Sequence, residues 1–382
     1  MPEAFVVGAV RSPVGRRNGS LSTIHPADLG AHVLRALVDR TGVDPGEIDD
    51  VLWGCVGQMG PQASNIGRTT VLSAGFPEKV PAVTIDRQCG SSQQALHFAA
   101  QAVMAGVQDL VVAGGVEVMS QVPIGSPTTV GLEHGMAHPR GGKGWAERYG
   151  DQEISQFRGA ELIAERWDLS REDMERYAVE SHARALRATA DGLFDEEIAP
   201  VEGVAHDEGP RPGTTPEKLA SLAALRPDGR LTAALASQIS DGAAALLVAS
   251  GDAVRRLGLT PMARVHTMVV VGSDPVFMLT GPIPATEALV ERSGIKVGDI
   301  GAFEVNEAFA SVPLAWLAET GADPERTNPQ GGAIALGHPL GGTGARLSTT
   351  LLHRMRRDGL RYGLQTMCEG GGMANATLFE LA

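Results

Sequence analysis

The sequence predicts an α/β fold made of two similar halves, with a further segment inserted between them. Small and branched apolar residues dominate, and aromatic residues make up 4% of the chain. This composition suits helices packed on buried parallel strands better than an antiparallel sandwich. A unit of helix, glycine and strand also occurs twice, which indicates a repeated fold. With 382 residues, the chain is long enough for two or three domains.

The first predicted element is a strand within residues 1–10, whose apolar run ends at Arg11. This segment lacks the basic start and the length of a signal peptide, and no apolar run approaches the roughly 20 residues of a membrane span. A net charge of −13 argues against a nucleic-acid or anionic-membrane surface, because both need clustered Lys and Arg. We therefore expect a cytoplasmic protein, without nucleic-acid partners or membrane insertion, whose three cysteines stay unpaired.

The repeated unit begins with an amphipathic helix. In the first half this helix follows Pro26 and stops at Gly42 before a strand. In the second half it follows Pro284 and stops at Gly294 before the strand 302–305. The two halves are therefore expected to share one fold.

The likeness continues after this unit. Cys89 opens an apolar-periodic helix, and the strand 109–113 then runs into a pair of glycines. In the second half His338 precedes a helix, and the strand 362–367 runs into Cys368 and a glycine loop. Ligands collect at the carboxyl ends of strands in open α/β sheets. We therefore expect Cys89, His338 and Cys368 to meet where the halves face each other.

Residues 120–240 differ in character from both halves. Turn-forming residues are frequent over 125–144, and a polar helix is predicted over 170–190. The chain returns to the core through the apolar stretch 241–248. This pattern indicates an inserted subdomain.

Cys89 and His338 suggest thiol-based acyl chemistry. The N–H groups of the helix that Cys89 precedes would lower the pKa of its thiol and favour a nucleophilic thiolate. The alternative is a buried structural cysteine. His338 stands in a Gly-His-Pro sequence, a poor place for a core histidine. It could be the base for Cys89, close in space and distant in sequence, or an ordinary surface or core residue.

Three further residues need an explanation. Cys368 could be a second acid/base with a pKa near 8 to 9, as carbon–carbon bond chemistry beside a thioester requires; a disulfide with Cys89 is disfavoured in the cytoplasm. Asn306 could hold a water or donate to an oxyanion, or be a turn residue. Cys55 is expected in the core. No motif supports a metal or a nucleotide-hydrolysing site.

Together these tracts resemble the thiolase family, the acetyl-CoA acyltransferases, over essentially the whole chain. The resemblance rests on the sequences around Cys89, from Asn306 to Phe309, from 331 to 339, and from Cys368 through three glycines. It implies a five-layered αβαβα thiolase fold from two similar halves, assembled as a homodimer or homotetramer. The implied domains are an N-terminal half of residues 1–118 completed by about 241–262, a CoA-binding loop domain of 119–240, and a C-terminal half of 263–382.

The resemblance also implies a role for each residue of the site. Cys89 would be the nucleophile that becomes acylated, His338 would activate it, and Cys368 would transfer the proton of the acetyl carbon. Asn306 would hold a water that stabilises the enolate oxygen together with His338. The N–H groups of Cys89 and Gly370 would form a second oxyanion hole.

Coenzyme A would be a co-substrate, with no permanently bound cofactor. Arg211 is the candidate for its nucleotide phosphate and Ser237 for its pantetheine. Lys218 and Phe309 are further candidates for CoA contacts.

Several positions depart from the family pattern. Ser92 stands where glycine is usual, Thr343 where serine is frequent, and Glu369 adds a charge beside Cys368. Biosynthetic acetoacetyl-CoA thiolases have a His-Met-Gly sequence where this chain has the tract 155–161, so the methionine that narrows their acyl pocket is missing. This difference favours a bulkier or more polar acyl chain.

The tracts 87–94, 149–157 and 274–279 look like those of degradative thiolases in actinobacterial steroid catabolism. Such an enzyme cleaves a 3-oxoacyl-CoA with CoA into acetyl-CoA and a shortened acyl-CoA, here on a medium, bulky or steroid-derived chain. Arg158 and Glu369 could contact a polar acyl group, or be a solvated charge and a supporting residue.

Three other functions are alternatives. A short-chain acetyl-CoA C-acetyltransferase would make acetoacetyl-CoA from the same residues. A decarboxylating condensing enzyme shares the fold but pairs its cysteine with two histidines, or with His and Asn, and Cys368 argues against it. A noncatalytic carrier of acyl-CoA or lipid would not need all of Cys89, His338, Asn306 and Cys368.

Overall fold

The computed structural model describes residues 3–382, and its strands form one mixed sheet in the order β4-β3-β5-β6-β1-β7-β10-β9-β8, with β2 beside β6. The first half supplies β1 (Ala4–Arg11), β2 (Gly15–Arg16), β3 (Asp50–Gly54), β4 (Ala82–Ile85), β5 (Leu110–Val118) and β6 (Ser240–Ser250). The second half supplies β7 (Ala263–Gly272), β8 (Ala302–Val305), β9 (Tyr362–Glu369) and β10 (Met373–Leu381). The halves join where β1 and β7 pair antiparallel at Phe5 and Val6. The predicted first strand is β1; Met1 and Pro2 lie outside the described residues.

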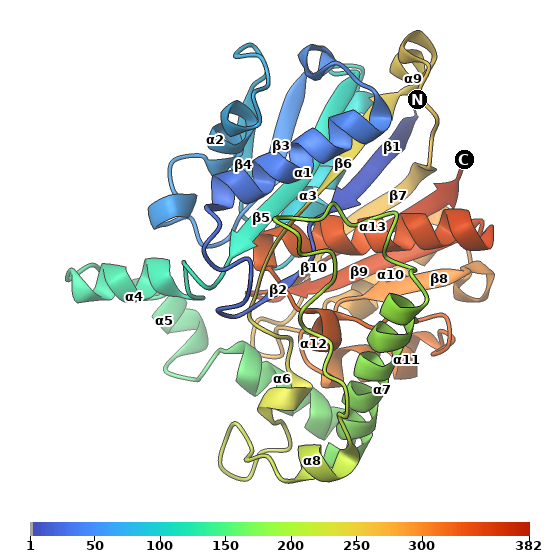
Figure 1. The fold of residues 1–382 in the computed structure, drawn as a ribbon. Helices are drawn as coiled ribbons and strands as arrows, with labels where there is room; N and C mark the ends of the chain where they lie inside the picture. Colours follow the sequence, from blue (N-terminus) through green and yellow to red (C-terminus); the bar gives the residue numbers. More distant parts are fainter. Residues whose placement is uncertain (1–2) are drawn as a thin grey trace.

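The strands of the two halves form two layers, with helices outside each half and between them, which gives the five layers predicted (Figure 1). The outer face of the first half carries α1 (Pro26–Thr41) and α2 (Ile66–Ser73), and that of the second half carries α10 (Pro282–Ser293) and α11 (Ser311–Thr320). Between the halves lie α3 (Ser91–Met104) and α13 (Leu340–Asp358). Apolar side chains from both halves pack around these two helices, including Leu246 of β6 and Phe379 of β10. The central layer therefore brings the start of α3 and the start of α13 to one place.

The repeated unit predicted from the sequence is present in both halves. Helix α1 ends at Gly42, whose φ is 70°, and α10 ends at Gly294, whose φ is 71°. These left-handed conformations favour glycine and stop a helix. Helix α10 begins at Pro282, two positions before Pro284, the residue that the predicted helix follows.

Strand β5 does not end at the glycine pair as predicted but continues to Val118. A β-carbon on Gly114 would lie 2.4 Å from the ring of Trp53, and one on Gly115 would lie 2.1 Å from the carbonyl oxygen of Gly341. Gly114 therefore makes room for Trp53 of β3, and Gly115 makes room for the start of α13, within a continuing strand. A pair of glycines in the sequence does not distinguish this use from a turn.

Helices are the main regular elements of the inserted segment. It contains α4 (Ser126–Glu133), α5 (Lys143–Tyr149), α6 (Gln156–Arg166), α7 (Arg171–Ala190) and α8 (Pro216–Ala220). The predicted helix over 170–190 is α7, which Ser170 caps by exchanging hydrogen bonds with Asp173. The prediction of turns over 125–144 missed α4, a short helix with no buried residue and hence no apolar face for a sequence to reveal.

Part of the inserted segment packs back on the first half. Arg11, fully buried at the end of β1, donates to Glu197 Oε1 at 2.6 Å and to Asp207 Oδ1 at 2.7 Å. Asp207 Oδ1 also accepts from the N–H of Val14 at 2.7 Å. These bonds hold the loop around residue 208 beside the sheet.

The remaining helices are α9 (Gly251–Leu257) and α12 (Ala333–Leu336). Across residues 3–382, none of the helices has the length and apolar character needed to cross a membrane.

Candidate active site

Cys89 lies in a tight turn between β4 and α3. Gln88, just before it, has a φ of 49°, which is uncommon for a residue with a side chain. Asp86 Oδ1 accepts from the N–H of Gln88 at 2.7 Å, and the hydroxyl of Ser91 donates to the carbonyl of Gln88 at 2.6 Å. These bonds hold the strained turn in place, so that it presents Cys89 ahead of the helix.

The pKa of the Cys89 thiol is raised to about 12, first by burial and then by the carboxyl of Glu369. The N–H groups of Cys89 and Gly370 act in the opposite direction. The predicted lowering of this pKa by the helix N-terminus is therefore wrong. The helix begins only at Ser91, and desolvation of the thiolate outweighs the backbone donors.

Cys368 lies near the end of β9 and is fully buried. Burial raises its pKa well above the ordinary value, and the neighbouring Cys89 adds to the effect; the predicted pKa near 8 to 9 is wrong for the resting thiol. All three cysteines are free, so the two thiols are not joined by a disulfide. Cys55 is buried in the core of the first half, as expected.

His338 precedes α13 and is held in one tautomer. The hydroxyl of Thr343 donates to the carbonyl of Pro339 at 2.8 Å and lies 2.6 Å from Nδ1 of His338. Because a hydroxyl has one proton to donate, we assign the imidazole proton to Nδ1, which then donates to Thr343. Nε2 then carries the lone pair of the ring and is the acceptor for Asn306 Nδ2, 3.4 Å away. Burial lowers the pKa of His338 to about 3, so the resting imidazole is neutral.

Asn306 faces this imidazole from the end of β8. Its Nδ2 lies 3.4 Å from Nε2 of His338, and its buried Oδ1 has no hydrogen-bond partner within residues 3–382. A buried amide oxygen without a donor indicates a place for a water. Asn306 and His338 therefore place two polar groups at one buried site, where a water could bind.

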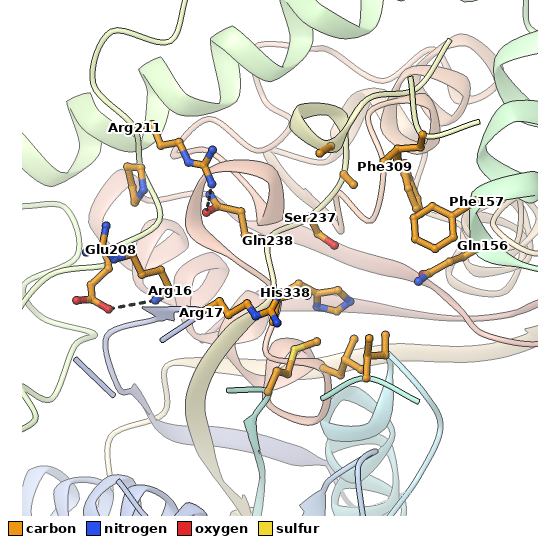
Figure 2. Close-up of a pocket in the computed structure, with 18 of the residues that line it drawn as sticks. Arg16, Arg17, Gln156, Phe157, Glu208, Arg211, Ser237, Gln238, Phe309 and His338 are labelled. Carbon is orange, nitrogen blue, oxygen red and sulfur yellow. Dashed lines mark hydrogen bonds between the residues drawn. The ribbon is translucent and has the colours of Figure 1, made fainter. Parts of the chain in front are cut away.

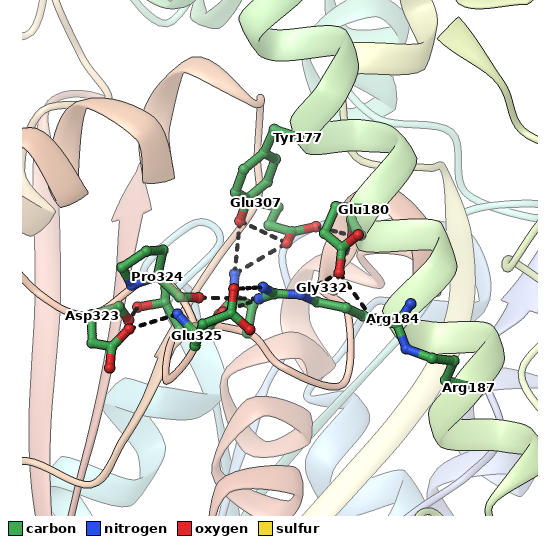
Figure 3. A network of polar contacts seen from close by, with 12 residues as sticks. Tyr177, Glu180, Arg184, Arg187, Glu307, Asp323, Pro324, Glu325 and Gly332 are labelled. Carbon is green, nitrogen blue, oxygen red and sulfur yellow. Dashed lines mark hydrogen bonds and ion pairs between the residues drawn. The ribbon is translucent and has the colours of Figure 1, made fainter.

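The next residue, Glu307, fixes this segment to α7 (Figure 3). Its carboxylate accepts from the hydroxyl of Tyr177 at 2.9 Å and from that of Ser181 at 2.8 Å. Asn328 Nδ2 and the N–H of Ile334 donate to it at 3.1 Å each. Glu307 thus connects the inserted segment with the two tracts that carry Asn306 and His338.

Two cavities meet at the site. The larger, of about 780 Å³, is lined by His338, and the other, of about 360 Å³, by Cys89 and Gly370. Four residues line both: Met119, Ile124, Gln156 and Leu340. A ligand that enters the larger cavity can therefore extend from His338 toward Cys89. No hydrogen bond joins these two side chains within the described part of the chain.

Three of the predicted CoA contacts, Arg211, Ser237 and Phe309, line the larger cavity together with His338 (Figure 2). Lys218 does not; it lines a neighbouring cavity of about 290 Å³ with Arg211, and its Nζ donates to the carbonyl of Gly213 at 2.7 Å. Arg158 lines neither of the two cavities at the site. Glu369 is buried, and its Oε1 lies against Gly90, the residue after Cys89.

Sequence reasoning missed Arg16 and Arg17, which also line the larger cavity. The available signal was an adjacent pair of arginines in an acidic chain. Phe157 belongs to the tract 149–157 but was not predicted to line the site. Its ring packs edge-on against Phe309 at 5.6 Å between centroids, and both side chains line the larger cavity. Within residues 3–382, no group of His, Cys, Asp and Glu is arranged to hold a metal.

Family profiles match nearly the whole chain. Residues 4–252 match the thiolase N-terminal domain, and residues 259–381 match the thiolase C-terminal domain. The chain therefore belongs to the thiolase family.

Individual members of the family with known names are also similar to this chain. The chain is 58% identical to the steroid 3-ketoacyl-CoA thiolase FadA6 of Mycobacterium tuberculosis, over 100% of this chain and 94% of that protein. It is 43% identical to a 3-ketoacyl-CoA thiolase of Yersinia pestis, over 100% of both chains. The crystal structure of the Bacillus anthracis acetyl-CoA acetyltransferase has a TM-score of 0.88 and 36% identity, covering 100% of this chain and 99% of that chain.

Proposed function

We propose that this protein is a degradative thiolase that cleaves a 3-oxoacyl-CoA with CoA, giving acetyl-CoA and a shortened acyl-CoA. The observation that carries the proposal is that His338, whose Nδ1 contacts Thr343, lines a cavity that adjoins the one lined by Cys89. The names of the relatives that span the whole chain support the same reaction. The name of the mycobacterial relative supports a bulky, steroid-derived acyl chain.

In the first step, the proton of the Cys89 thiol moves to Nε2 of His338, and the thiolate attacks the 3-keto carbon. A thiolate whose conjugate acid has a raised pKa is a strong nucleophile. The bond between C2 and C3 then breaks, its electron pair forms the enolate of acetyl-CoA, and Cys368 protonates that carbon. The products are an acyl thioester on Cys89, acetyl-CoA and a Cys368 thiolate.

In the second step, CoA gives its thiol proton to Cys368 and attacks the acyl group on Cys89. The Cys89 thiolate leaves and recovers its proton from His338. Asn306, with its water and His338, stabilises the enolate oxygen, and the N–H groups of Cys89 and Gly370 stabilise the oxyanion of the thioester. Every thiol is thus returned to its starting state.

CoA is proposed as a co-substrate, with no permanently bound cofactor. Arg211 is assigned to its nucleotide phosphate, Ser237 and Phe309 to its pantetheine arm, and Lys218 to a more distant contact. Arg16 and Arg17 add positive charge to the same cavity, which suits a phosphate-bearing ligand in an acidic protein.

The organisation of the molecule is part of the proposal. We assign residues 1–118 with about 241–262 to the N-terminal half, 119–240 to the CoA-binding loop domain, and 263–382 to the C-terminal half. The protein is proposed to work in the cytoplasm as a homodimer or homotetramer.

CoA-dependent release of acetyl-CoA from a panel of 3-oxoacyl-CoAs tests the function. The panel runs from acetoacetyl-CoA through long linear chains to branched, carboxylated and steroid-ring-derived esters. Higher kcat/KM for bulky members is expected. A preference for acetoacetyl-CoA would indicate a short-chain acetyl-CoA C-acetyltransferase, and binding of acyl-CoA without cleavage would indicate a carrier.

A further inference from the structure

Glu369 is a buried carboxyl group to which the proposed reaction gives no role. It ends β9, directly after Cys368, and its side chain is fully buried. Neither carboxyl oxygen has a hydrogen-bond partner within residues 3–382. Burying a carboxylate without donors costs several kcal/mol, roughly the scale of a whole domain's stability, so such a group tends to keep its proton.

A second buried acceptor lies beside it. Asn375 of β10 donates through Nδ2 to Gln94 Oε1 at 3.2 Å, and the same nitrogen lies 3.3 Å from Nδ1 of His97. Because Nδ2 faces Gln94 and His97, Oδ1 of Asn375 points away from them, and it has no hydrogen-bond partner in the described residues. A β-carbon on Gly90 would lie 1.9 Å from Glu369 Oε1 and 3.1 Å from Asn375 Oδ1. Two orphaned oxygens therefore lie against the residue that follows the nucleophile, and a single proton between them would satisfy both.

We propose that Glu369 is a positioning residue that works as a neutral carboxylic acid, donating its O–H to Asn375 Oδ1 behind Cys89. Its lack of charge leaves Cys89 and Cys368 free to become thiolates in turn, whereas a carboxylate there would oppose both. This inference rests on the proposed function, because the proposed thiolase reaction requires both Cys89 and Cys368 to ionise.

The charged and titratable groups around Glu369 agree with a neutral acid. Burial raises the pKa of Glu369 to about 8, and Arg87 in the turn before α3 only partly opposes this. Burial lowers the pKa of His97 on α3 to about 3, so its ring is neutral. Asp86, in the same turn as Arg87, adds to the elevation of the pKa of Cys89. Glu369 is therefore protonated at pH 7, and above about pH 8 its charge raises the pKa of the thiols.

Infrared spectroscopy tests the protonation state directly. The wild type at pH 7 should show the carbonyl band of a protonated carboxylic acid that is absent in Glu369→Gln and disappears above about pH 8. Glu304→Gln is the matched control, because Glu304 is another buried glutamate with a pKa raised to about 8; it should remove a different band and leave that of Glu369. Identical spectra for the wild type and Glu369→Gln at pH 7 would overturn the proposal and would indicate that Asn375 donates to an ionised Glu369.

Alkylation of Cys89 by iodoacetamide, followed by peptide mass spectrometry, tests the effect on the nucleophile. In Glu369→Gln, whose amide can still donate to Asn375, the apparent pKa of Cys89 should fall by on the order of one unit. Glu304→Gln should leave it at the wild-type value. An unchanged pKa in Glu369→Gln contradicts the proposal.

The wild type alone provides a second test in case Glu369→Gln does not fold. Its alkylation rate should rise less than tenfold per pH unit between about pH 7 and 9, where Glu369 ionises. A uniform tenfold rise through that range would overturn the proposal as well. None of these readouts depends on turnover, so this inference can fail while cleavage of 3-oxoacyl-CoA stands, and the reverse.

Discussion

At the scale of single residues, the chemistry depends on which nitrogen of His338 carries the lone pair that can accept a proton. Thr343 decides this, because its hydroxyl proton is committed to the carbonyl of Pro339 and its oxygen can then only accept from Nδ1. The family resemblance marked Thr343 as a departure from serine. Both side chains offer a hydroxyl in the same place, so the departure preserves the hydrogen bond that orients the base.

Thr343→Val removes this hydroxyl while keeping the shape of the side chain. The imidazole loses the partner of Nδ1, so the productive tautomer is no longer enforced. We expect kcat to fall roughly tenfold to a hundredfold, since the base is misdirected rather than removed, with KM nearly unchanged. Thr343→Ser should restore most of the rate. Steady-state kinetics with one 3-oxoacyl-CoA measures this, and a wild-type kcat in Thr343→Val would contradict the assigned role.

The sequence predicted candidate site residues, but it did not predict their electrostatics. Cys89, His338, Cys368 and Asn306 stood out because each follows a strand or precedes a helix. The raised pKa of Cys89 could not be read from the same pattern, since it depends on burial and on Glu369, which is 280 positions away in the chain. Charge and burial from distant segments add up only once the halves are packed.

At the scale of elements, helix α7 attaches the inserted segment to the site through Glu307. Its Tyr177 and Ser181 both donate to Glu307, while Arg184 donates to the carbonyl of Thr327 at 2.8 Å. Displacement of α7 would therefore disturb the segment that carries Asn306. The polar pattern of this helix predicted that it forms but not which residues of the second half it contacts.

Glu307→Ala is expected to lower the free energy of unfolding by about 3 kcal/mol, because several buried donors lose a charged acceptor. Urea unfolding at a fixed protein concentration measures the loss. Glu325→Ala is the control: Glu325 pairs with Arg184 at 3.1 Å, but its side chain is 84% exposed, so the change should cost at most about 1 kcal/mol. Equal losses in the two variants would show that the Glu307 network does not anchor α7.

The elements of the two halves were predicted more completely than those of the insertion. Glycines at left-handed positions end α1 and α10, and such stops are visible in a sequence. Strand β5 was cut short and α4 was missed. In those places the reason for the structure is a close approach across the fold or a helix without a buried face, and neither leaves a periodic pattern.

At the scale of the whole molecule, buried ionisable groups make stability depend on pH. Burial raises the pKa of Glu304 and of Glu369 to about 8, against about 4.3 in an unfolded chain. Burial lowers the pKa of His97 and of His338 to about 3, against about 6.5 when unfolded. Above about pH 6.5 these histidines are neutral in both states, so among these four groups the two acids alone bind more protons in the folded state.

The stability that Glu304 and Glu369 contribute is fully present below their pKa in the unfolded chain, about 4.3. It is lost as the pH rises through their pKa in the folded protein, about 8. Each acid should therefore lower the free energy of unfolding by up to about 1.4 kcal/mol per pH unit between about pH 6.5 and 8. Glu304→Gln removes one of these contributions, so its stability should fall less steeply than that of the wild type. Urea unfolding at several pH values measures the slopes, and an equal slope in both proteins would contradict the assignment.

The central claim is that acyl transfer runs through Cys89, with Cys368 handling the proton of the acetyl carbon. Its most direct test is a single turnover with a bulky 3-oxoacyl-CoA in the absence of free CoA, followed by peptide mass spectrometry. The wild type should release about one acetyl-CoA per site and gain the shortened acyl group on Cys89. Cys89→Ala should do neither, and Cys368→Ala should accept an acyl group from a simple acyl-CoA without cleaving the 3-oxo substrate. Release of acetyl-CoA without acylation of Cys89, or turnover by Cys89→Ala, would contradict the account.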